Sequence, residues 1–248
     1  MIAIVTGATG GLGQEFIKQI KDDVEQVWAV GRSVEKLAAL KGTFGEKIVP
    51  VQVDLSDTDE LLAFCKKIEK EKPQIRYLVN NAGTARMAPV TDFPPEEISA
   101  MLDINDKAAA LLCRACLPCM PAGSFILNVA SASAFQPNPY IALYSASKAF
   151  LLSFTRSLNV ENKSVTCTAV CPGWVDTKML PKDRNGKQIR YPGMVTADKV
   201  VAAALKDARR GKDVSVCSFY NRYLRFLSKV TPHSMIMKMW MRGIKDYV

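Results

Sequence analysis

The segment LYSASKAF, residues 143–150, places a tyrosine four positions before a lysine. Positions i and i+4 lie on the same face of a helix, so we expect the Tyr144 phenol and the Lys148 ammonium to be neighbours. A cation beside a phenol favours the phenolate and would lower the pKa of Tyr144 from about 10 towards neutrality. Such a pair can donate and accept protons at cellular pH. The alternative is an exposed Tyr/Lys pair on an ordinary helix.

A glycine-rich stretch near the start of the chain is the second chemical feature. TGATGGLG, residues 6–13, follows an apolar run and precedes a helical pattern. Gly7, Gly11 and Gly13 would let a pyrophosphate approach the backbone and the helix N-terminus. The strand–turn–helix context indicates a dinucleotide site more strongly than glycines alone. The spacing G-x3-G-x-G differs from the more widespread G-x-G-x-x-G.

The end of the second apolar run indicates which dinucleotide would bind. An NAD site would carry an acidic residue here for the adenosine ribose. In VGRS, Gly31 leaves that place empty and Arg32 follows, and a guanidinium pairs well with a phosphate. We therefore predict NADP(H) as the cofactor; the alternative is that Arg32 is a surface charge. Asp54 in VDL and the NNAG segment at 80–83 would lie at the same carboxyl edge of a parallel sheet, where ligands bind.

Composition limits the classes of protein. The chain has 248 residues, which suits one sizeable domain or two small ones, and its composition, 48% hydrophobic and 23% charged, is that of a soluble globular protein. No apolar run approaches the roughly 20 residues that span a bilayer, and the start lacks a basic region and a cleavage site, so we expect a cytoplasmic protein.

The single histidine, His233, argues against a multi-histidine metal site and a Ser-His-Asp triad. Cys113, Cys116 and Cys119 have iron–sulfur-like spacing, but their apolar helix favours a core role, and we predict no metal.

Short apolar runs alternate with amphipathic patterns along the chain. This alternation predicts a parallel sheet covered by helices on both faces. The expected strands are Ile2–Thr6, Gln26–Val30, Lys47–Val53, Ile75–Val79, Ser124–Val129, Val165–Val170 and Asp213–Cys217. The expected helices begin after Gly11 and cover Val34–Leu40, Thr58–Glu71, Glu96–Leu117, Tyr144–Val160 and Thr196–Arg210. The polar segment Met179–Met194 contains Pro and Gly, and we expect a mobile loop over a site.

Taken in order, these motifs resemble the short-chain dehydrogenase/reductase family. The matches are TGATGGLG at 6–13, VDL at 53–55, NNAG at 80–83, Asn105, Ser131, YSASK at 144–148 and PGWVDT at 172–177. The resemblance covers roughly residues 1–218. It implies a single-domain Rossmann fold, a doubly wound seven-stranded parallel sheet with helices on both faces. The residues within these motifs are most similar to those of hydroxysteroid dehydrogenases and long-chain β-ketoacyl reductases.

The resemblance implies four catalytic residues. Ser131 would hydrogen-bond the substrate carbonyl, and Tyr144 would donate a proton as hydride arrives from the nicotinamide. Lys148 would lower the pKa of Tyr144 and bind the nicotinamide ribose. Asn105 would hold a water that links Lys148 to solvent. Ser133 is a rival for the serine role, although its spacing fits less well.

The resemblance also implies which residues contact the cofactor and the substrate. The cofactor set is Gly7, Thr9, Gly11, Leu12, Gly13, Arg32, Asp54, Leu55, Asn81, Ala82, Gly83, Tyr144, Lys148, Pro172, Gly173, Val175 and Thr177. The substrate set is Ser131, Phe135, Gln136, Tyr144, Trp174, Met179 and Leu180, with Tyr140 a weaker candidate. The substrate set is mostly apolar, as a lipophilic ketone requires, and the alternative is that these residues are core.

Residues 219–248 are predicted to form a basic amphipathic extension. From Arg209 onward, nine basic residues face two acidic ones. Phe219, Tyr223, Phe226 and Val230 recur at helical spacing. Several interpretations stay open: the extension caps the substrate site, packs at a subunit interface, lies on an anionic membrane surface, or is ordinary core packing. A positive extension would also attract an acidic substrate. Members of the family usually form dimers or tetramers, so we expect a homodimer or homotetramer.

We therefore predict an NADP(H)-dependent oxidoreductase that interconverts a ketone and a secondary alcohol, on a lipophilic substrate such as a steroid, bile acid or acyl chain. The alternatives are a nucleotide-binding regulator or scaffold and a reductase of small polar ketones. A full set of Asn105, Ser131, Tyr144 and Lys148 favours the enzyme. Nucleic-acid binding is disfavoured because the basic residues alternate with an apolar stripe rather than an aromatic stacking platform.

Overall fold

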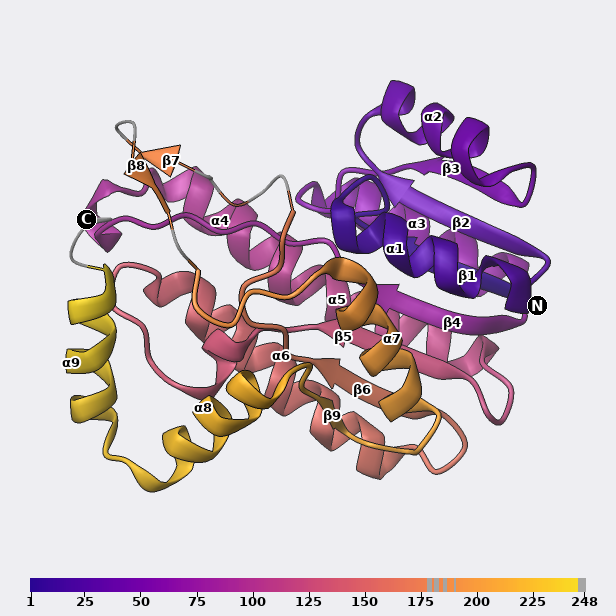
Figure 1. The fold of residues 1–248 in the computed structure, drawn as a ribbon. Helices are drawn as coiled ribbons and strands as arrows, with labels where there is room; N and C mark the ends of the chain where they lie inside the picture. Colours follow the sequence, from indigo (N-terminus) through magenta and orange to yellow (C-terminus); the bar gives the residue numbers. More distant parts are fainter. Residues whose placement is uncertain (178–179, 181–182, 185–186, 190, 245–248) are drawn as a thin grey trace.

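The computed structural model describes residues 1–177, 180, 183–184, 187–189 and 191–244. Within these residues, seven parallel strands form one sheet in the order β3-β2-β1-β4-β5-β6-β9 (Figure 1). The strands are β1 Ile2–Thr6, β2 Gln26–Gly31, β3 Ile48–Gln52, β4 Ile75–Asn80, β5 Phe125–Val129, β6 Thr166–Val170 and β9 Val214–Ser215. The expected doubly wound parallel sheet is confirmed.

Helices cover both faces of the sheet, and alternation along β1 shows how. Ala3 and Val5 point to one face and Ile2 and Ile4 to the other, because successive side chains of a strand alternate. The first face packs against α1 Gly11–Ile20, α2 Val34–Phe44 and α7 Ala197–Ala208. The second face packs against α3 Thr58–Glu71, α5 Ala108–Cys116 and α6 Ala142–Glu161.

The helix expected over Glu96–Leu117 is interrupted. Chain 95–116 forms α4 Pro95–Leu102, a π-helical turn Asp103–Lys107, and then α5. In the turn, the Ala108 N–H donates to the Asp103 carbonyl, five residues back. A π-turn inserts one extra residue per turn and redirects the side chains it contains. The apolar periodicity continues on both sides of the turn, which is why the pattern reads as one helix.

The cysteine run lies in the second helical layer. Cys113 and Cys116 belong to the apolar cluster beneath α3 and α5, and Cys119 is half-buried just after α5. Burial raises the pKa of the Cys113 thiol to about 12. These cysteines therefore serve as small core residues.

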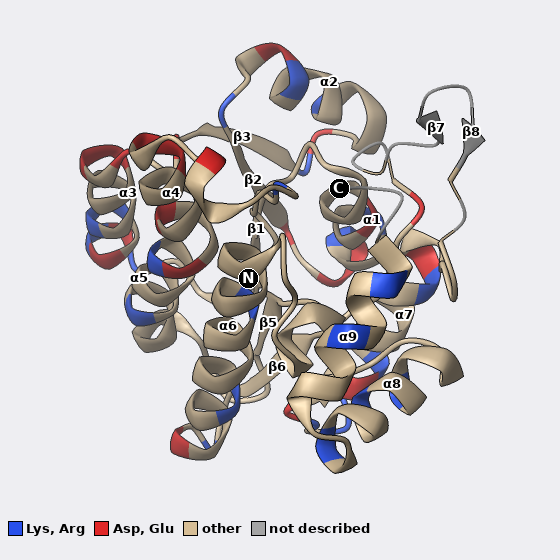
Figure 2. Cartoon of the chain, turned by 90° about the vertical axis from the view of Figure 1, so that its left-hand side faces the viewer, with Lys and Arg blue, Asp and Glu red and all other residues tan. Residues whose placement is uncertain are grey.

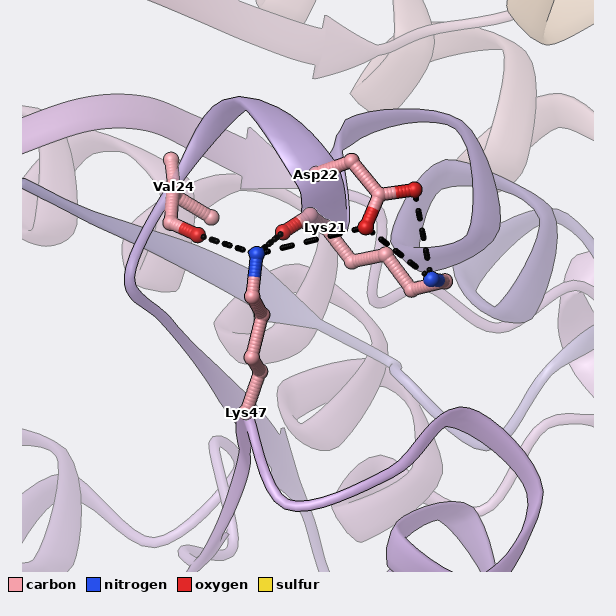
Figure 3. A network of polar contacts seen from close by, with 4 residues as sticks. All are labelled: Lys21, Asp22, Val24 and Lys47. Atoms are coloured by element: carbon pink, nitrogen blue, oxygen red, sulfur yellow. Dashed lines mark hydrogen bonds and ion pairs between the residues drawn. The ribbon is translucent and has the colours of Figure 1, made fainter.

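A network of polar contacts connects neighbouring segments at the amino edge of the sheet (Figure 3). Lys47 Nζ donates to the carbonyls of Lys21 and Val24, at 3.1 Å each, and lies 3.9 Å from the Asp22 carboxylate. These bonds tie the start of β3 to the segment that precedes β2. On the same edge, the Tyr77 hydroxyl donates to Asp23 at 2.7 Å, and Arg209 pairs with the same carboxylate at 3.1 Å.

The C-terminal part adds two helices, α8 Phe219–Val230 and α9 His233–Ile244, at the end of the molecule away from α2 (Figure 1). A short antiparallel ribbon, β7 Asp183–Arg184 with β8 Lys187–Gln188, lies in the segment expected to be a loop. Residues 179, 181–182, 185–186 and 190 of that segment lie outside the described residues. No helix in the described part of the chain is long and apolar enough to cross a bilayer. The division at residue 218 stays a prediction.

Candidate active site

The glycine turn is pressed against the end of β4. Gly7 has a φ of +58°, and a Cβ there would lie 2.9 Å from the Ala82 Cα. A Cβ at Gly13 would lie 2.3 Å from the Gly7 carbonyl oxygen. Asn81 Nδ2 donates to the carbonyls of Thr6 and Gly7 at 3.1 and 3.0 Å. Only glycine fits these positions, and the contact joins β1 and β4, where the strand order reverses.

The start of α1 offers an anion site. Within the described part of the chain, no side chain caps this helix: the N-cap is Gly10, and the first turn holds no acidic residue. The first N–H groups of a helix without a cap carry a partial positive charge and lack internal partners. A Cβ at Gly11 would lie 3.0 Å from Thr177 Cγ2, so the loop 172–177 reaches the same turn. The turn therefore fits the pyrophosphate of a dinucleotide.

Arg32 and Asp54 meet at the ends of β2 and β3. Arg32 Nη1 lies 3.9 Å from Asp54 Oδ2, and the arginine side chain is 70% exposed, which leaves its guanidinium open to a phosphate. Burial opposes ionisation of Asp54, but two hydrogen bonds from Ser56 outweigh it and hold the pKa of the carboxyl below its ordinary value. The Leu55 side chain lies in the core beside α3, so only its backbone faces the predicted adenine.

Three of the predicted catalytic side chains come together at the carboxyl ends of β5 and β6. Ser131 follows β5 and begins a 3-10 turn, Ala132–Phe135, where its Oγ accepts from the Ser133 N–H at 3.1 Å. The Ser131 side chain is also close enough to the Tyr144 phenol to affect its pKa, so Ser131 and not Ser133 is the serine beside it. Lys148 Nζ lies 5.6 Å from the centroid of the Tyr144 ring.

The expected lowering of the Tyr144 pKa is wrong for this structure. Burial raises the pKa of the phenol above its ordinary value, and the neighbouring Ser131 side chain only reduces that rise. Lys148 is 4% exposed, and burial lowers the pKa of its ammonium to about 8. Its Nζ donates to the Val129 carbonyl at 2.8 Å. Desolvation of both groups therefore outweighs the attraction between the cation and a phenolate.

Asn105 fixes the loop after β4 to α6. It is 1% exposed; its Oδ1 accepts from the Thr84 N–H at 2.9 Å, and its Nδ2 donates to the Thr84 carbonyl and to Ser147 Oγ, both at 3.0 Å. A Cβ at Gly83 would lie 3.1 Å from Asn105 Oδ1 and 3.3 Å from Lys148 Nζ. The asparagine side chain thus positions the loop over the lysine, while the water relay stays a prediction.

Two groups near Lys148 were not found from the sequence. Asp106 follows Asn105 in the π-turn; burial raises the pKa of its carboxyl to about 6, although Lys148 opposes the rise. Its Oδ1 is buried and has no hydrogen-bond partner among the described residues. Cys171, at the end of β6, is fully buried, and burial raises the pKa of its thiol to about 12. Each stands next to a matched motif, which was the only available signal.

Among the predicted substrate residues, Phe135 contacts the C-terminal helices, while Trp174 and Leu180 contact their own loop segments. The Phe135 ring lies 5.4 Å from the Arg225 guanidinium of α8. The Trp174 and Tyr191 rings lie 4.9 Å apart, and the Leu180 N–H donates to the Thr177 carbonyl at 3.2 Å. Gln136 follows Phe135 and is half-buried. Met179 lies outside the described residues.

The C-terminal helices contact chain segments that precede and follow Tyr144, the predicted catalytic tyrosine. A Cβ at Gly173 would lie 2.4 Å from Asn221 Oδ1, so α8 packs tightly on the loop 172–177. Trp240 Nε1, from α9, donates to the Pro139 carbonyl at 2.9 Å. The next residue, Tyr140, has a φ of +66°, and its carbonyl accepts from the Ala88 N–H at 2.8 Å. The inner faces of α8 and α9 therefore border the segments in which the substrate residues are predicted.

Comparison with known proteins places this geometry in a family. The sequence profile of the short chain dehydrogenases matches residues 1–188. An uncharacterised oxidoreductase of Staphylococcus epidermidis is 29% identical over 82% of this chain and 90% of its own length. The very-long-chain 3-oxoacyl-CoA reductase of Anas platyrhynchos is 31% identical over 98% of this chain and 80% of its own length.

Solved structures agree with these relatives. A short chain dehydrogenase from Burkholderia cenocepacia, crystallised with NADP, superimposes with a TM-score of 0.78 at 26% identity, covering 97% of both chains. A 7β-hydroxysteroid dehydrogenase shares the fold, with a TM-score of 0.83 at 21% identity and 96% of both chains covered. The matches along the sequence and the fold agree, and the protein belongs to the short-chain dehydrogenase family of oxidoreductases.

Proposed function

We propose that the protein interconverts a ketone and a secondary alcohol with NADP(H), and that its substrate is lipophilic. The observation that carries this proposal is the meeting of Ser131, Tyr144 and Lys148 at the carboxyl edge of the sheet, the edge that also holds the uncapped start of α1. The site thus offers a proton donor, a group that can orient a carbonyl, and a place for a dinucleotide. Membership of the family supports the reaction class.

Ser131, Tyr144 and Lys148 each have a separate role in reducing the ketone. When bound, NADPH would supply the hydride that adds to the carbonyl carbon of the substrate. Ser131 Oγ accepts from the Ser133 N–H, which leaves its own hydrogen free to donate to the substrate carbonyl. Tyr144 transfers its phenolic proton to the carbonyl oxygen, so that ketone, hydride and proton make the alcohol. Lys148, anchored on the Val129 carbonyl, stabilises the phenolate that remains.

The raised pKa of Tyr144 affects reduction of the ketone and oxidation of the alcohol differently. A protonated phenol is a ready acid at neutral pH, so the residue begins the reductive half-reaction in the correct state. Oxidation of the alcohol requires the phenolate. We therefore expect the reductive rate to be maintained through neutral pH and the oxidative rate to increase as the pH is raised above it.

The choice of NADP(H) is supported by Arg32 and by relatives. The exposed guanidinium stands where a 2′-phosphate would be recognised, and no acidic residue occupies position 31. Substituting Arg32→Asp should shift the ratio of kcat/KM for NADPH over NADH by at least about tenfold towards NADH. Lys66→Asp, an exposed charge on α3, is the matched control. An unchanged ratio in Arg32→Asp would remove the assignment.

A lipophilic substrate is supported by the apolar residues on the substrate side, Phe135, Trp174 and Leu180. The relative from Anas platyrhynchos is named for a long acyl substrate, and it aligns with nearly the whole chain. Small polar ketones are the competing class. The cytoplasmic location and the homodimeric or homotetrameric assembly stay predictions.

The test follows NADPH consumption with a panel of steroids and bile acids, β-ketoacyl thioesters and small polar ketones. Tyr144→Phe should lose about 10²- to 10⁴-fold in kcat while NADPH binding persists. Tyr77→Phe, at the opposite edge of the sheet, is the matched control. Turnover of small polar ketones alone would contradict the lipophilic assignment. Tight NADPH binding without turnover of any ketone would favour a nucleotide-binding regulator or scaffold.

A further inference from the structure

Helix α8 presents its apolar side to solvent. Phe219, Tyr223, Phe226 and Val230 follow each other at helical spacing and are 82%, 52%, 61% and 61% exposed. On the opposite side of the helix, Asn221 and Ser228 are buried. Amphipathic helices of globular proteins normally bury the apolar stripe and expose the polar one. We call these four exposed residues the α8 stripe.

The orientation of α8 is fixed by specific contacts. Ser218 Oγ accepts from the Asn221 N–H at 3.3 Å, and Asn221 Nδ2 donates to the Cys217 carbonyl at 3.2 Å. Arg225 lies over the Phe135 ring, and Asn221 fills the space beside Gly173. Turning the helix to bury the α8 stripe would break all of these contacts. The stripe is therefore available to an apolar partner outside the chain.

Basic residues lie on α8, the helix of the stripe, and on the neighbouring α9. Arg222 and Lys229 lie on α8 itself, and Lys238 and Arg242 lie on α9, which follows after two residues. Figure 2 shows the basic bands on both helices. The sequence from 214 to 244 contains no aspartate or glutamate. Met235 and Met239 of α9 are also exposed, at 55% and 52%, and add flexible apolar side chains.

The charge around the α8 stripe distinguishes its two possible partners, a second copy of the chain and an anionic bilayer. A two-fold pairing of copies through this face would bring the same patch against itself, with cation facing cation and no carboxylate from 214–244 to balance it. An anionic bilayer accepts both components, because aromatic and aliphatic side chains enter the headgroup boundary while Arg and Lys meet lipid phosphates. We propose that α8 docks the protein on an anionic lipid surface, with the α8 stripe embedded and the basic residues of α8 and α9 on the headgroups.

The same helix connects this surface to the candidate active site. The inner side of α8 contacts Phe135 and Gly173, so docking would bring the bilayer close to the substrate side. A lipophilic ketone held in the bilayer would then lie near its site of reduction. The docking itself rests on the exposed stripe and the charge, and its test does not depend on turnover.

The experiment measures sedimentation of the full chain with phosphatidylcholine vesicles that contain or lack phosphatidylserine. We expect binding to the anionic vesicles, weakened by salt because Debye screening shortens the reach of the charges. Phe226→Asp should reduce this binding by at least about tenfold, since it places a carboxylate in the boundary. Val160→Asp is the matched control: Val160 is 79% exposed on α6, away from the α8 stripe, and its substitution should leave binding unchanged. Lys229→Gln should weaken binding by about fivefold.

Three results would overturn the proposal. Wild-type protein that stays in the supernatant with anionic vesicles at low salt is the first. Equal sedimentation of wild type and Phe226→Asp is the second. The third is a change of molar mass in light scattering for Phe226→Asp with vesicle binding intact, because that would assign the α8 stripe to an interface between copies. Thermal melting of each variant separates loss of docking from loss of folding.

Discussion

The amino and carboxyl edges of the parallel sheet hold charged groups in opposite settings. At the amino edge, Lys47 has two carbonyls and a carboxylate within reach, and Asp23 accepts from Tyr77 and Arg209. At the carboxyl edge, Lys148 is buried with a lowered pKa, and Asp106 is half-buried with a raised one. Shifted pKa values of this kind mark functional sites more often than structural ones. The contrast separates the edge that holds the sheet from the edge that we propose performs the chemistry.

Glycines divide in the same way. At Gly7 and Gly13 of the carboxyl edge a Cβ would strike the backbone, whereas a Cβ at Gly42 in α2 would meet nothing within 4 Å. Close approach of backbone to backbone at Gly13 leaves room for a ligand on the open side of the turn. The glycine in α2 has no such reason, and it weakens its helix.

The largest effect should follow Lys148→Met. Methionine fills a similar volume without the ammonium, so the phenolate of Tyr144 loses its stabilising charge. We expect kcat/KM to fall by about 10²- to 10⁴-fold. Since burial disfavours the charged lysine, the melting temperature should not fall. Steady-state kinetics with calorimetry tests both statements, and near wild-type activity would mean that the buried lysine is only structural.

The next effect should follow Gly13→Ala. Its Cβ would lie 2.3 Å from the Gly7 carbonyl oxygen, so the turn must shift. We expect a loss of about 2 kcal/mol in the free energy of unfolding and weaker NADPH binding. Gly42→Ala is the control and should stabilise the protein by about 0.5–1 kcal/mol with unchanged binding. Chemical denaturation and fluorescence titration measure the pair, and equal NADPH affinities would show that the turn does not hold the cofactor.

Local pattern was sufficient for most of the fold but not for the state of the site. Helix α3 has the expected bounds, Thr58–Glu71, because the carboxylate of Asp57 caps its start and its apolar positions recur regularly. The π-turn at Asp103–Lys107 was missed because apolar periodicity does not show whether a backbone N–H bonds the carbonyl four residues back, as in an α-helix, or five residues back, as here. The pKa of Tyr144 was predicted in the wrong direction because spacing places the lysine but does not reveal how deeply both groups are buried.

Cys171 and Asp106 show the same limit from the other side. Neither residue type nor spacing distinguishes Cys171 from the core cysteines, and only the packing of β6 against α6 brings it near Tyr144 and Lys148. Asp106 would lie on an ordinary helix surface if the π-turn were absent. Motifs therefore locate the site, while desolvation, which depends on the whole fold, determines its protonation.

A smaller effect should follow Asp106→Asn, and it depends on pH. The folded pKa of about 6 is above the ordinary 3.8, so the stability this carboxyl contributes is present at low pH and is lost as the pH rises through about 6. The variant should therefore exceed wild type by about 1 kcal/mol above that pH, a figure reduced for partial exposure, and match it near pH 4. Urea unfolding across this range is the measurement. A pH-independent difference would mean that the carboxyl does not titrate there.

The smallest effect should follow Lys47→Met, the amino-edge counterpart of the Lys148 substitution. The same chemical change removes two hydrogen bonds to carbonyls and a long ion pair, but the side chain is 44% exposed, so water replaces the lost partners. We expect a loss of about 0.5 kcal/mol in the free energy of unfolding and no change in kcat/KM. Unfolding and kinetics run beside Lys148→Met complete the comparison. If Lys47→Met impaired turnover as strongly, the division of the sheet into a structural and a chemical edge would fail, because a lysine far from the phenol would then matter as much as the one beside it.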